Sequence, residues 1–194
     1  PYKSGVAYPD PVAALHGVTA ILMALWHRRR TGQGQFIDLS QLEATTALIG
    51  EHIVGYGMTS EVPRSMGNRH PYMAPHGCYP SQGEDRWLAI SVGSDEQWRA
   101  LCQVMGKPDL AEDQDFRDPL SRWHQQDCLD EIISNWTKTL EHREAMRLLQ
   151  EAGVPAGAVL DAEEMLNDPH LQEGDFFWEV PHPEAGTYVY PGLP

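Results

Sequence analysis

The stretch YPDPVAALHGVTAILMALWHRRRTGQGQFIDLSQLEA, residues 8–44, places an aspartate between two prolines at the start of an apolar segment. Its apolar residues at positions 15, 18, 22 and 25 recur at the spacing of one face of an α-helix, and we expect that face to pack into a core. Arg28 to Arg30 fall in the last helical turn, where the helix dipole favours cations, and Gly32 is typical of a helix end. The apolar part, residues 11–26, is shorter than the roughly 20 residues that cross a bilayer, so we expect no membrane segment here.

The residues after this helix indicate an α/β fold. Residues 35–40, QFIDLS, are typical of a short strand. Residues 40–58 predict a second helix, whose start carries Ser40 and Glu43 at the spacing of a capping box. Helix, strand and helix in succession belong to the α/β class.

From about Thr59 to Gly77 the chain is rich in proline, glycine and asparagine, which predicts a linker or a functional loop. The segments beyond it predict a second α/β region with a short sheet. They are strands 77–81 and 86–92 as a hairpin, helices 94–106, 121–140 and 141–153, a strand 156–161 and a short helix 162–171.

Composition limits the possible functions. The formal charge is 14 − 28 = −14, which argues against binding to nucleic acid or to an anionic membrane surface, because both are bound by positive charge. The three cysteines, Cys78, Cys102 and Cys128, are widely spaced and form no C-x-x-C pair, so the sequence suggests neither a disulfide framework nor a zinc site. We therefore expect no metal and a reducing, cytoplasmic location.

Asp10 is open to two interpretations. An aspartate followed by proline at the first helical position is a preferred N-cap arrangement, because its side chain accepts a free backbone N–H. The positive end of the helix also favours an ionised carboxylate, which is the form that attacks an acyl group. The spacing alone does not separate a cap from a nucleophile.

The same stretch resembles the signature of the class III CoA-transferase family. In that family a catalytic aspartate stands at the start of an apolar helix, which is followed by a basic patch, a Thr-Gly-x-Gly-x motif and a strand that contains an aspartate. In this chain the catalytic aspartate corresponds to Asp10 and the basic patch to residues 28–30. The Thr-Gly-x-Gly-x motif corresponds to residues 31–35 and the strand to residues 36–38. Further blocks that resemble the family are GNRHPYMAPHGCY at 67–79, DRWLAISVGSDEQWRALC at 85–102, GVPAGAV at 153–159 and DPHL at 168–171. The resemblance extends over nearly the whole chain.

This resemblance implies a Rossmann-like large domain and a small α/β domain, from an intertwined homodimer. Residues 1–58 would be part of the large domain, 59–160 the linker and small domain, and 161–194 the return toward the large domain. The chain would then be the second half of a longer subunit, inactive in isolation, with most CoA-binding residues upstream.

The implied reaction is the transfer of CoA from an acyl-CoA to a carboxylic acid, with Asp10 as a covalent nucleophile. Acyl-CoA and the acceptor acid would be the substrates, and no metal, nucleic acid or membrane would take part. The family also has a mobile active-site loop, which predicts substrate binding by Gly67, Asn68, Arg69 and His70. The alternative is a structural connector, since turn chemistry alone explains glycine and proline.

Two other functions stay open. An α-methylacyl-CoA racemase would use the same aspartate for proton transfer, although racemases tend to show Gly-Asp where this chain has Pro9 before Asp10. A non-catalytic interaction domain would use Asp10 only as a cap. The basic run at residues 27–30 is not favoured as an anion site, because a solvated basic helix end is the usual arrangement. The spacing of His70, His76 and Cys78 matches no familiar zinc arrangement.

Overall fold

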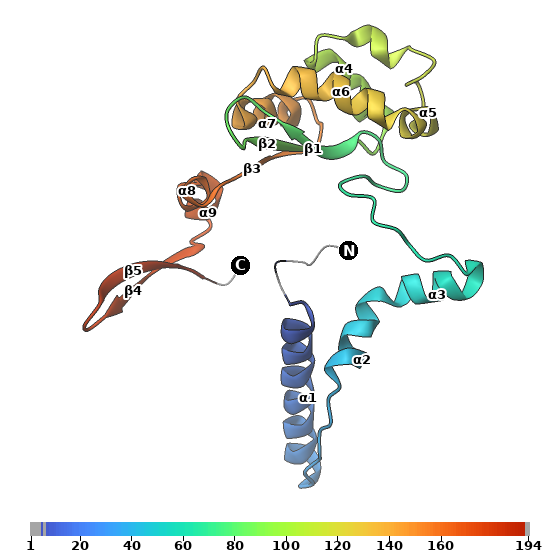
Figure 1. The fold of residues 1–194 in the computed structure, drawn as a ribbon. Helices are drawn as coiled ribbons and strands as arrows, with labels where there is room; N and C mark the ends of the chain where they lie inside the picture. Colours follow the sequence, from blue (N-terminus) through green and yellow to red (C-terminus); the bar gives the residue numbers. More distant parts are fainter. Residues whose placement is uncertain (1–4, 6, 193–194) are drawn as a thin grey trace. The chain divides into compact units, whose positions relative to one another are not determined.

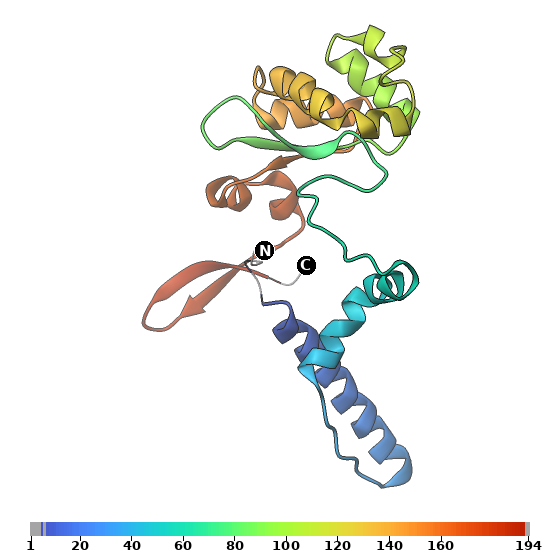
Figure 2. The same cartoon turned by 45° about the vertical axis from the view of Figure 1, so that its right-hand side comes forward.

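The computed structural model describes all residues except 1–4, 6 and 193–194. The chain is a mixed α/β protein that divides into two compact units, Pro1–Ser65 and Met66–Pro194 (Figures 1 and 2). None of the helices in these described ranges has the length and apolar character needed to cross a membrane.

The first unit is helical. Helix α1 spans Pro9–Thr31 and ends at Gly32, whose φ of 75° lets its N–H bond to the carbonyl of Arg28. The helix and its glycine end are therefore confirmed. Residues 33–40 then return without regular structure to α2 (Gln41–Thr46), which continues through the 3₁₀ turn η1 (Ala47–Ile49) into α3 (Gly50–Thr59).

Two expectations about this unit need correction. The strand at residues 35–40 does not form, because a strand needs a neighbour for its hydrogen bonds and the strands of the two described sheets all lie after residue 75. The single helix 40–58 is interrupted, since Ile49 leaves helical geometry at φ −114° and ψ 21°. Its capped start is confirmed, with the Ser40 side chain accepting the N–H of Glu43 at 3.2 Å.

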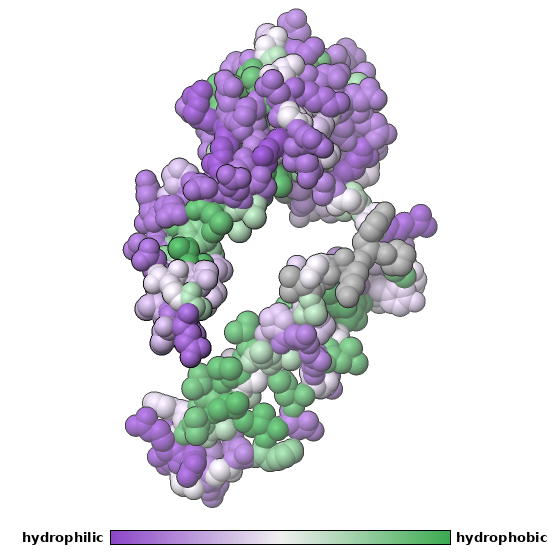
Figure 3. Space-filling model, turned by 60° about the vertical axis from the view of Figure 1, so that its left-hand side comes forward, coloured by the Kyte–Doolittle hydropathy of each residue, from purple (hydrophilic) through white to green (hydrophobic). Residues whose placement is uncertain are grey.

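The apolar face of α1 is exposed in this chain by itself, so the described residues do not supply the core into which we expect it to pack. Leu22 is 61% and Trp26 62% exposed, and only Ala13 of this helix is buried. Figure 3 shows apolar side chains gathered over α1 and its neighbours, whereas the visible face of the α/β core is mostly hydrophilic. Within the described residues of the first unit, no element covers the face that the sequence pattern defines.

The second unit contains a three-stranded antiparallel sheet in the order β1-β2-β3. Strand β1 (His76–Pro80) and β2 (Trp87–Ser91) form the predicted hairpin, and β3 (Ala156–Val159) pairs with the other edge of β2. Tyr79, Leu88 and Ile90 point to one face, where they join the core. The hairpin and the third strand are thus confirmed.

Helices cover this face of the sheet (Figure 1). They contribute buried side chains that include Trp98, Leu101, Leu129, Ile133 and Leu149. In chain order the elements are α4 (Asp95–Val104), η2 (Pro108–Ala111), α5 (Pro119–His124), α6 (Gln126–Thr137) and α7 (His142–Glu151). The predicted helix 121–140 is two helices, since Gln125 lies at φ −102° and ψ 22° between α5 and α6.

The chain ends in α8 (Ala162–Leu166), α9 (Pro169–Glu173) and a hairpin of β4 (Phe177–His182) with β5 (Gly186–Pro191). The hairpin was not predicted. Its strands are largely exposed, and their residues do not alternate strictly between apolar and polar, which is the pattern by which a strand is recognised in a sequence.

Candidate functional site

Asp10 lies inside the first turn of α1 and does not cap it. The N-cap is Tyr8, which makes no side-chain cap bond, and Pro9 occupies the first helical position. The backbone N–H of Asp10 instead donates to the carbonyl of Ala7 at 3.0 Å. The interpretation of Asp10 as a helix cap is therefore wrong, because the helix begins one residue before it.

Within the part of the chain that the structure describes, the Asp10 carboxylate has one hydrogen-bond donor. Gln41 Nε2, at the first position of α2, donates to Asp10 Oδ1 at 2.6 Å. The side chain is exposed, and among the described residues it takes part in no ion pair. Oδ2 thus stays available for a reaction partner within this part of the chain.

The four predicted loop residues, Gly67, Asn68, Arg69 and His70, come together in the second unit. Gly67 has a φ of 64°, which a glycine adopts at little cost, and the N–H of Arg69 closes the turn on the carbonyl of Met66 at 3.2 Å. The carbonyl of Asn68 faces His76 Nδ1 at 2.6 Å, and that of His70 accepts the indole N–H of Trp123 at 3.1 Å. The loop is therefore fixed to the sheet and to α5.

Arg69 is paired with two carboxylates of α6. Its Nη2 donates to Asp127, and to Asp130 Oδ2 at 2.9 Å. These hydrogen bonds hold the pKa of Arg69 above its usual range. Asp130 also accepts the hydroxyl of Tyr79 at 3.0 Å, and burial followed by the Asp130 charge raises the pKa of Tyr79. Arg69 is thus engaged by protein groups.

A hollow of about 240 Å³ lies beside this loop. Arg69, His76 and Cys78 are among its lining residues, and the rings of His70 and His76 are 5.2 Å apart. Burial raises the pKa of the Cys78 thiol, which keeps it in its unreactive neutral form.

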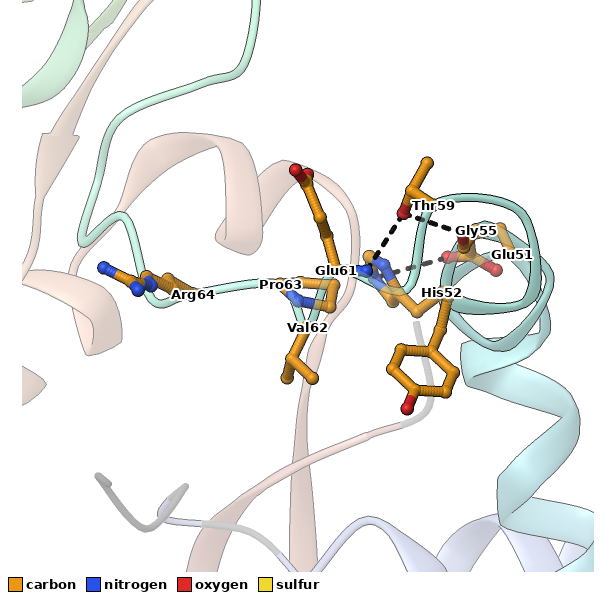
Figure 4. A pocket seen from close by; sticks show the side chains of 9 residues that line it. Glu51, His52, Gly55, Thr59, Glu61, Val62, Pro63 and Arg64 are labelled. Carbon is orange, nitrogen blue, oxygen red and sulfur yellow. Dashed lines mark hydrogen bonds and ion pairs between the residues drawn. The ribbon is translucent and has the colours of Figure 1, made fainter.

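A separate hollow of about 830 Å³ lies in the first unit, between α3 and the segment after it (Figure 4). It is lined by Glu51, His52, Gly55, Tyr56, Thr59, Glu61, Val62, Pro63 and Arg64. Thr59 Oγ1 donates to the carbonyl of Gly55 and accepts the N–H of Glu61. It contains neither Asp10 nor the loop residues, and its polar groups serve this turn.

One group in the second unit has metal-ligating residue types. Nδ1 of the buried His142 lies 2.9 Å from Glu141 and its Nε2 lies 2.9 Å from Glu164, although neither contact has good hydrogen-bond geometry. A metal ion would bind one ring nitrogen of His142, and the other ring nitrogen would still face a glutamate carboxylate. Glu141 also caps α7 and Glu164 binds Arg86, so the arrangement is typical of an anchor between α7 and α8.

The sequence did not indicate Gln41, Asp127 or Asp130. Gln41 reaches Asp10 across 31 residues, and Arg69 reaches the two aspartates across 58 and 61. No local spacing carries a contact over such separations. The capped start at Ser40, which places Gln41 at the first position of α2, is the nearest sequence signal.

The chain is similar to known proteins over its full length. CoA-transferase family III matches residues 1–194. The chain is 34% identical over 186 residues to succinyl-CoA–D-citramalate CoA-transferase of Chloroflexus aurantiacus, covering 96% of this chain and 46% of that protein. It is 33% identical over 193 residues to succinate–glutarate CoA-transferase of Agrobacterium fabrum, covering 100% of this chain and 47% of that protein.

A solved structure agrees with these sequence relatives. The CAIB/BAIF family protein from Brucella suis superposes with a TM-score of 0.82 at 26% identity, covering all of this chain and 53% of that one. The chain thus spans about half the length of the curated relatives it matches. A match to the family over every residue, supported by sequence relatives and fold, identifies the chain as a member of CoA-transferase family III.

Proposed function

We propose that the complete protein transfers CoA from an acyl-CoA to a carboxylic acid, with Asp10 as the covalent nucleophile. The observation that carries this proposal is the state of the Asp10 carboxylate, which neither caps α1 nor pairs with a cation in the described parts of the chain. It lies in the first turn of a 23-residue helix, where the helix dipole favours negative charge. Its Oδ2, which accepts no hydrogen bond from the described residues, is therefore available for acyl transfer.

The reaction divides into reversible steps. Asp10 Oδ2 attacks the thioester carbonyl and releases CoA thiolate, which leaves a mixed anhydride. The thiolate attacks Cγ of Asp10 and expels the donor acid, so that the enzyme carries an aspartyl-CoA thioester. The acceptor carboxylate then takes the place of the thiolate, and the thiolate attacks the acceptor's acyl carbon and frees Asp10. A carboxylate suits these steps because its anhydride and thioester are both reactive.

The names of the relatives support an inference about the class of carboxylic acid that this protein uses. The C. aurantiacus protein is named for succinyl-CoA and citramalate, and the A. fabrum protein for succinate and glutarate. All of these are small dicarboxylic acids. We infer the same class for this protein, with the loop at Gly67, Asn68, Arg69 and His70 close to the substrate.

Replacement of Asp10 by asparagine tests the proposal in the complete protein. The variant keeps the shape of the side chain at an exposed position, so we expect near-native stability. A neutral amide is a poor nucleophile, so kcat should fall by several orders of magnitude. The matched control is Glu61→Gln, which makes the same chemical change at an exposed carboxylate of the same unit and should keep full activity.

Trapping provides a second measurement. Incubation with acyl-CoA followed by hydroxylamine should modify the peptide that contains Asp10 in the unsubstituted protein and leave it unmodified in Asp10→Asn. Full transferase activity of Asp10→Asn, or a label on another peptide, would disprove the nucleophile. If Asp10→Asn loses only α-proton exchange of the acyl-CoA, and no covalent adduct forms on Asp10 in the unsubstituted protein, racemase chemistry would be favoured instead.

A further inference from the structure

The path of the chain brings Gln41 next to Asp10. A helix of 23 residues is about 34 Å long at 1.5 Å per residue, and the nine residues 33–41 span about 30 Å when extended. The return segment lies against α1 at Gly17, where a Cβ would come 3.4 Å from Leu39 Cδ2. The two lengths match, and α2 therefore starts beside the first turn of α1.

In the contact between Gln41 and Asp10, the donor and the acceptor can be assigned. An ionised carboxylate only accepts hydrogen bonds, so the amide nitrogen of Gln41 faces Asp10 Oδ1 at 2.6 Å. Gln41 is exposed and stands at the first position of α2, where Ser40 caps the helix. The amide is thus not needed to cap α2, and its donor serves the carboxylate.

We propose that Gln41 Nε2 is an oxyanion donor for the steps that occur at Cγ of Asp10, an inference that rests on the covalent function proposed above. When CoA thiolate adds to Cγ of the mixed anhydride, the C–S bond forms and the π electron pair of Cγ–Oδ1 moves onto Oδ1. The pair returns as the Cγ–Oδ2 bond breaks, and the donor acid leaves as a carboxylate with Oδ2. No proton is transferred, and charge is conserved.

The same oxygen carries the charge in the next step. When the acceptor carboxylate adds to Cγ of the thioester, Oδ1 again takes the electron pair, and its return breaks the C–S bond and releases CoA thiolate. Gln41 Nε2 lies 2.6 Å from Oδ1 of the resting carboxylate, the atom on which the oxyanion would form.

A neutral donor suits this role better than a cation. Arginine or lysine would stabilise the resting carboxylate strongly and so reduce its attack on the thioester. The amide of Gln41 gives one hydrogen bond to Oδ1, and the described residues supply no hydrogen bond to Oδ2. One oxygen is therefore held for the oxyanion while the other is left to attack.

The test uses Gln41→Leu and Gln41→Glu in the complete protein. The first variant removes the amide at similar size, and the second keeps the shape without an N–H donor. Loss of one oxyanion donor lowers kcat by about 10²–10³-fold, and we expect this loss with KM nearly unchanged. Release of CoA thiol in the first turnover, which reports attack by Asp10, should keep its rate, whereas formation of the aspartyl-CoA thioester, followed by rapid quench and intact mass, should slow with kcat.

Gln33→Leu is the matched control, because Gln33 is exposed and its side chain makes no hydrogen bond in the described parts of the first unit. Thermal melting of each variant separates a folding defect from a chemical one, and an unchanged melting midpoint is expected for all three. If both Gln41 variants keep kcat within about threefold of the unsubstituted protein while Asp10 still forms its adduct, the oxyanion role is overturned and the nucleophile stands. If no adduct forms on Asp10 in the unsubstituted protein, the covalent function itself fails.

Discussion

The guanidinium of Arg69 donates a hydrogen bond of 2.9 Å to the carboxylate of Asp130, which also accepts the hydroxyl of the buried Tyr79. One carboxylate of α6 thereby joins the loop after Met66 to the core side of β1. Arg69 donates to Asp127 as well, so its charge is already balanced. We therefore propose that Arg69 acts on the substrate by fixing the loop.

Replacement of Arg69 by methionine should change kinetics more than stability. The ion pair with Asp130 is partly exposed, with 40% and 36% of the two side chains accessible, and pairs of this kind contribute under about 1 kcal/mol to the free energy of unfolding. In the complete protein we expect a raised KM or a lowered kcat, since a loosened loop positions the substrate poorly. Steady-state kinetics and urea unfolding measure the two effects.

Arg99→Met is the control, because Arg99 is an exposed arginine of the same unit and takes part in no ion pair with the described residues. Asp130→Asn, combined with Arg69→Met, identifies the cause. If Arg69 acts through Asp130, the double variant should lose no more than the stronger single one. Strictly additive losses would show that Arg69 acts independently of Asp130.

The fold was predictable wherever local patterns decide it. The glycine end of α1 and the capped start at Ser40 were correctly predicted, because a cap depends on residues a few positions apart. The strand predicted at 35–40 was wrong, since a strand depends on a hydrogen-bonded neighbour that no described element provides. Residues close together in the sequence therefore determine where helices begin and end, whereas tertiary contacts determine which strands form and which faces are buried.

The candidate site divides in the same way. Asp10 was predicted as the nucleophile from its motif, and the cap interpretation was wrong because Pro9, one residue earlier, takes the first helical position. Gln41 could not be predicted, because its contact depends on the length of α1 matching the length of the return segment. Arg122 was missed for another reason: arginine is almost always exposed, so its place in the core contradicts the usual preference.

Arg122 supplies a stability prediction. It is 1% exposed and donates to the carbonyls of Ala74 and Phe116, each at 3.0 Å, and to Asp95 at 2.8 Å, with its guanidinium 5.5 Å from the ring centre of Trp98. Arg122→Met keeps most of the volume but leaves two carbonyls and a carboxylate without their donor. We expect a loss of about 3 kcal/mol in the free energy of unfolding.

Urea unfolding followed by tryptophan fluorescence measures this loss. The control is Arg147→Met, which removes an exposed helical ion pair with Glu151 and should cost only about 0.3–0.5 kcal/mol. Equal losses in the two variants would contradict the structural role of the buried guanidinium.

Two capping aspartates make the second unit sensitive to acid. Asp118 accepts the N–H of Ser121 at 2.9 Å at the start of α5, and Asp161 accepts that of Glu164 at 2.8 Å at the start of α8. The backbone hydrogen bond to Ser121 lowers the pKa of Asp118 below its usual 3.8. The backbone hydrogen bond to Glu164, followed by the hydrogen bond from Arg86, lowers the pKa of Asp161 in the same way.

Because the pKa of each aspartate is lower in the folded than in the unfolded chain, the stabilisation is fully present well above pH 3.8 and is lost as the pH falls through the folded-state value. Asparagine caps a helix about as well as aspartate but does not titrate. The double variant Asp118→Asn, Asp161→Asn should therefore have a melting temperature close to that of the unsubstituted protein at pH 7. Between pH 5 and pH 3 its melting temperature should fall less than that of the unsubstituted protein. This pH range is set by the usual aspartate pKa of about 3.9. Asp115→Asn, at an exposed aspartate that caps no helix, should follow the unsubstituted protein throughout. Parallel curves for the double variant and the unsubstituted protein would show that these two caps do not cause the acid sensitivity.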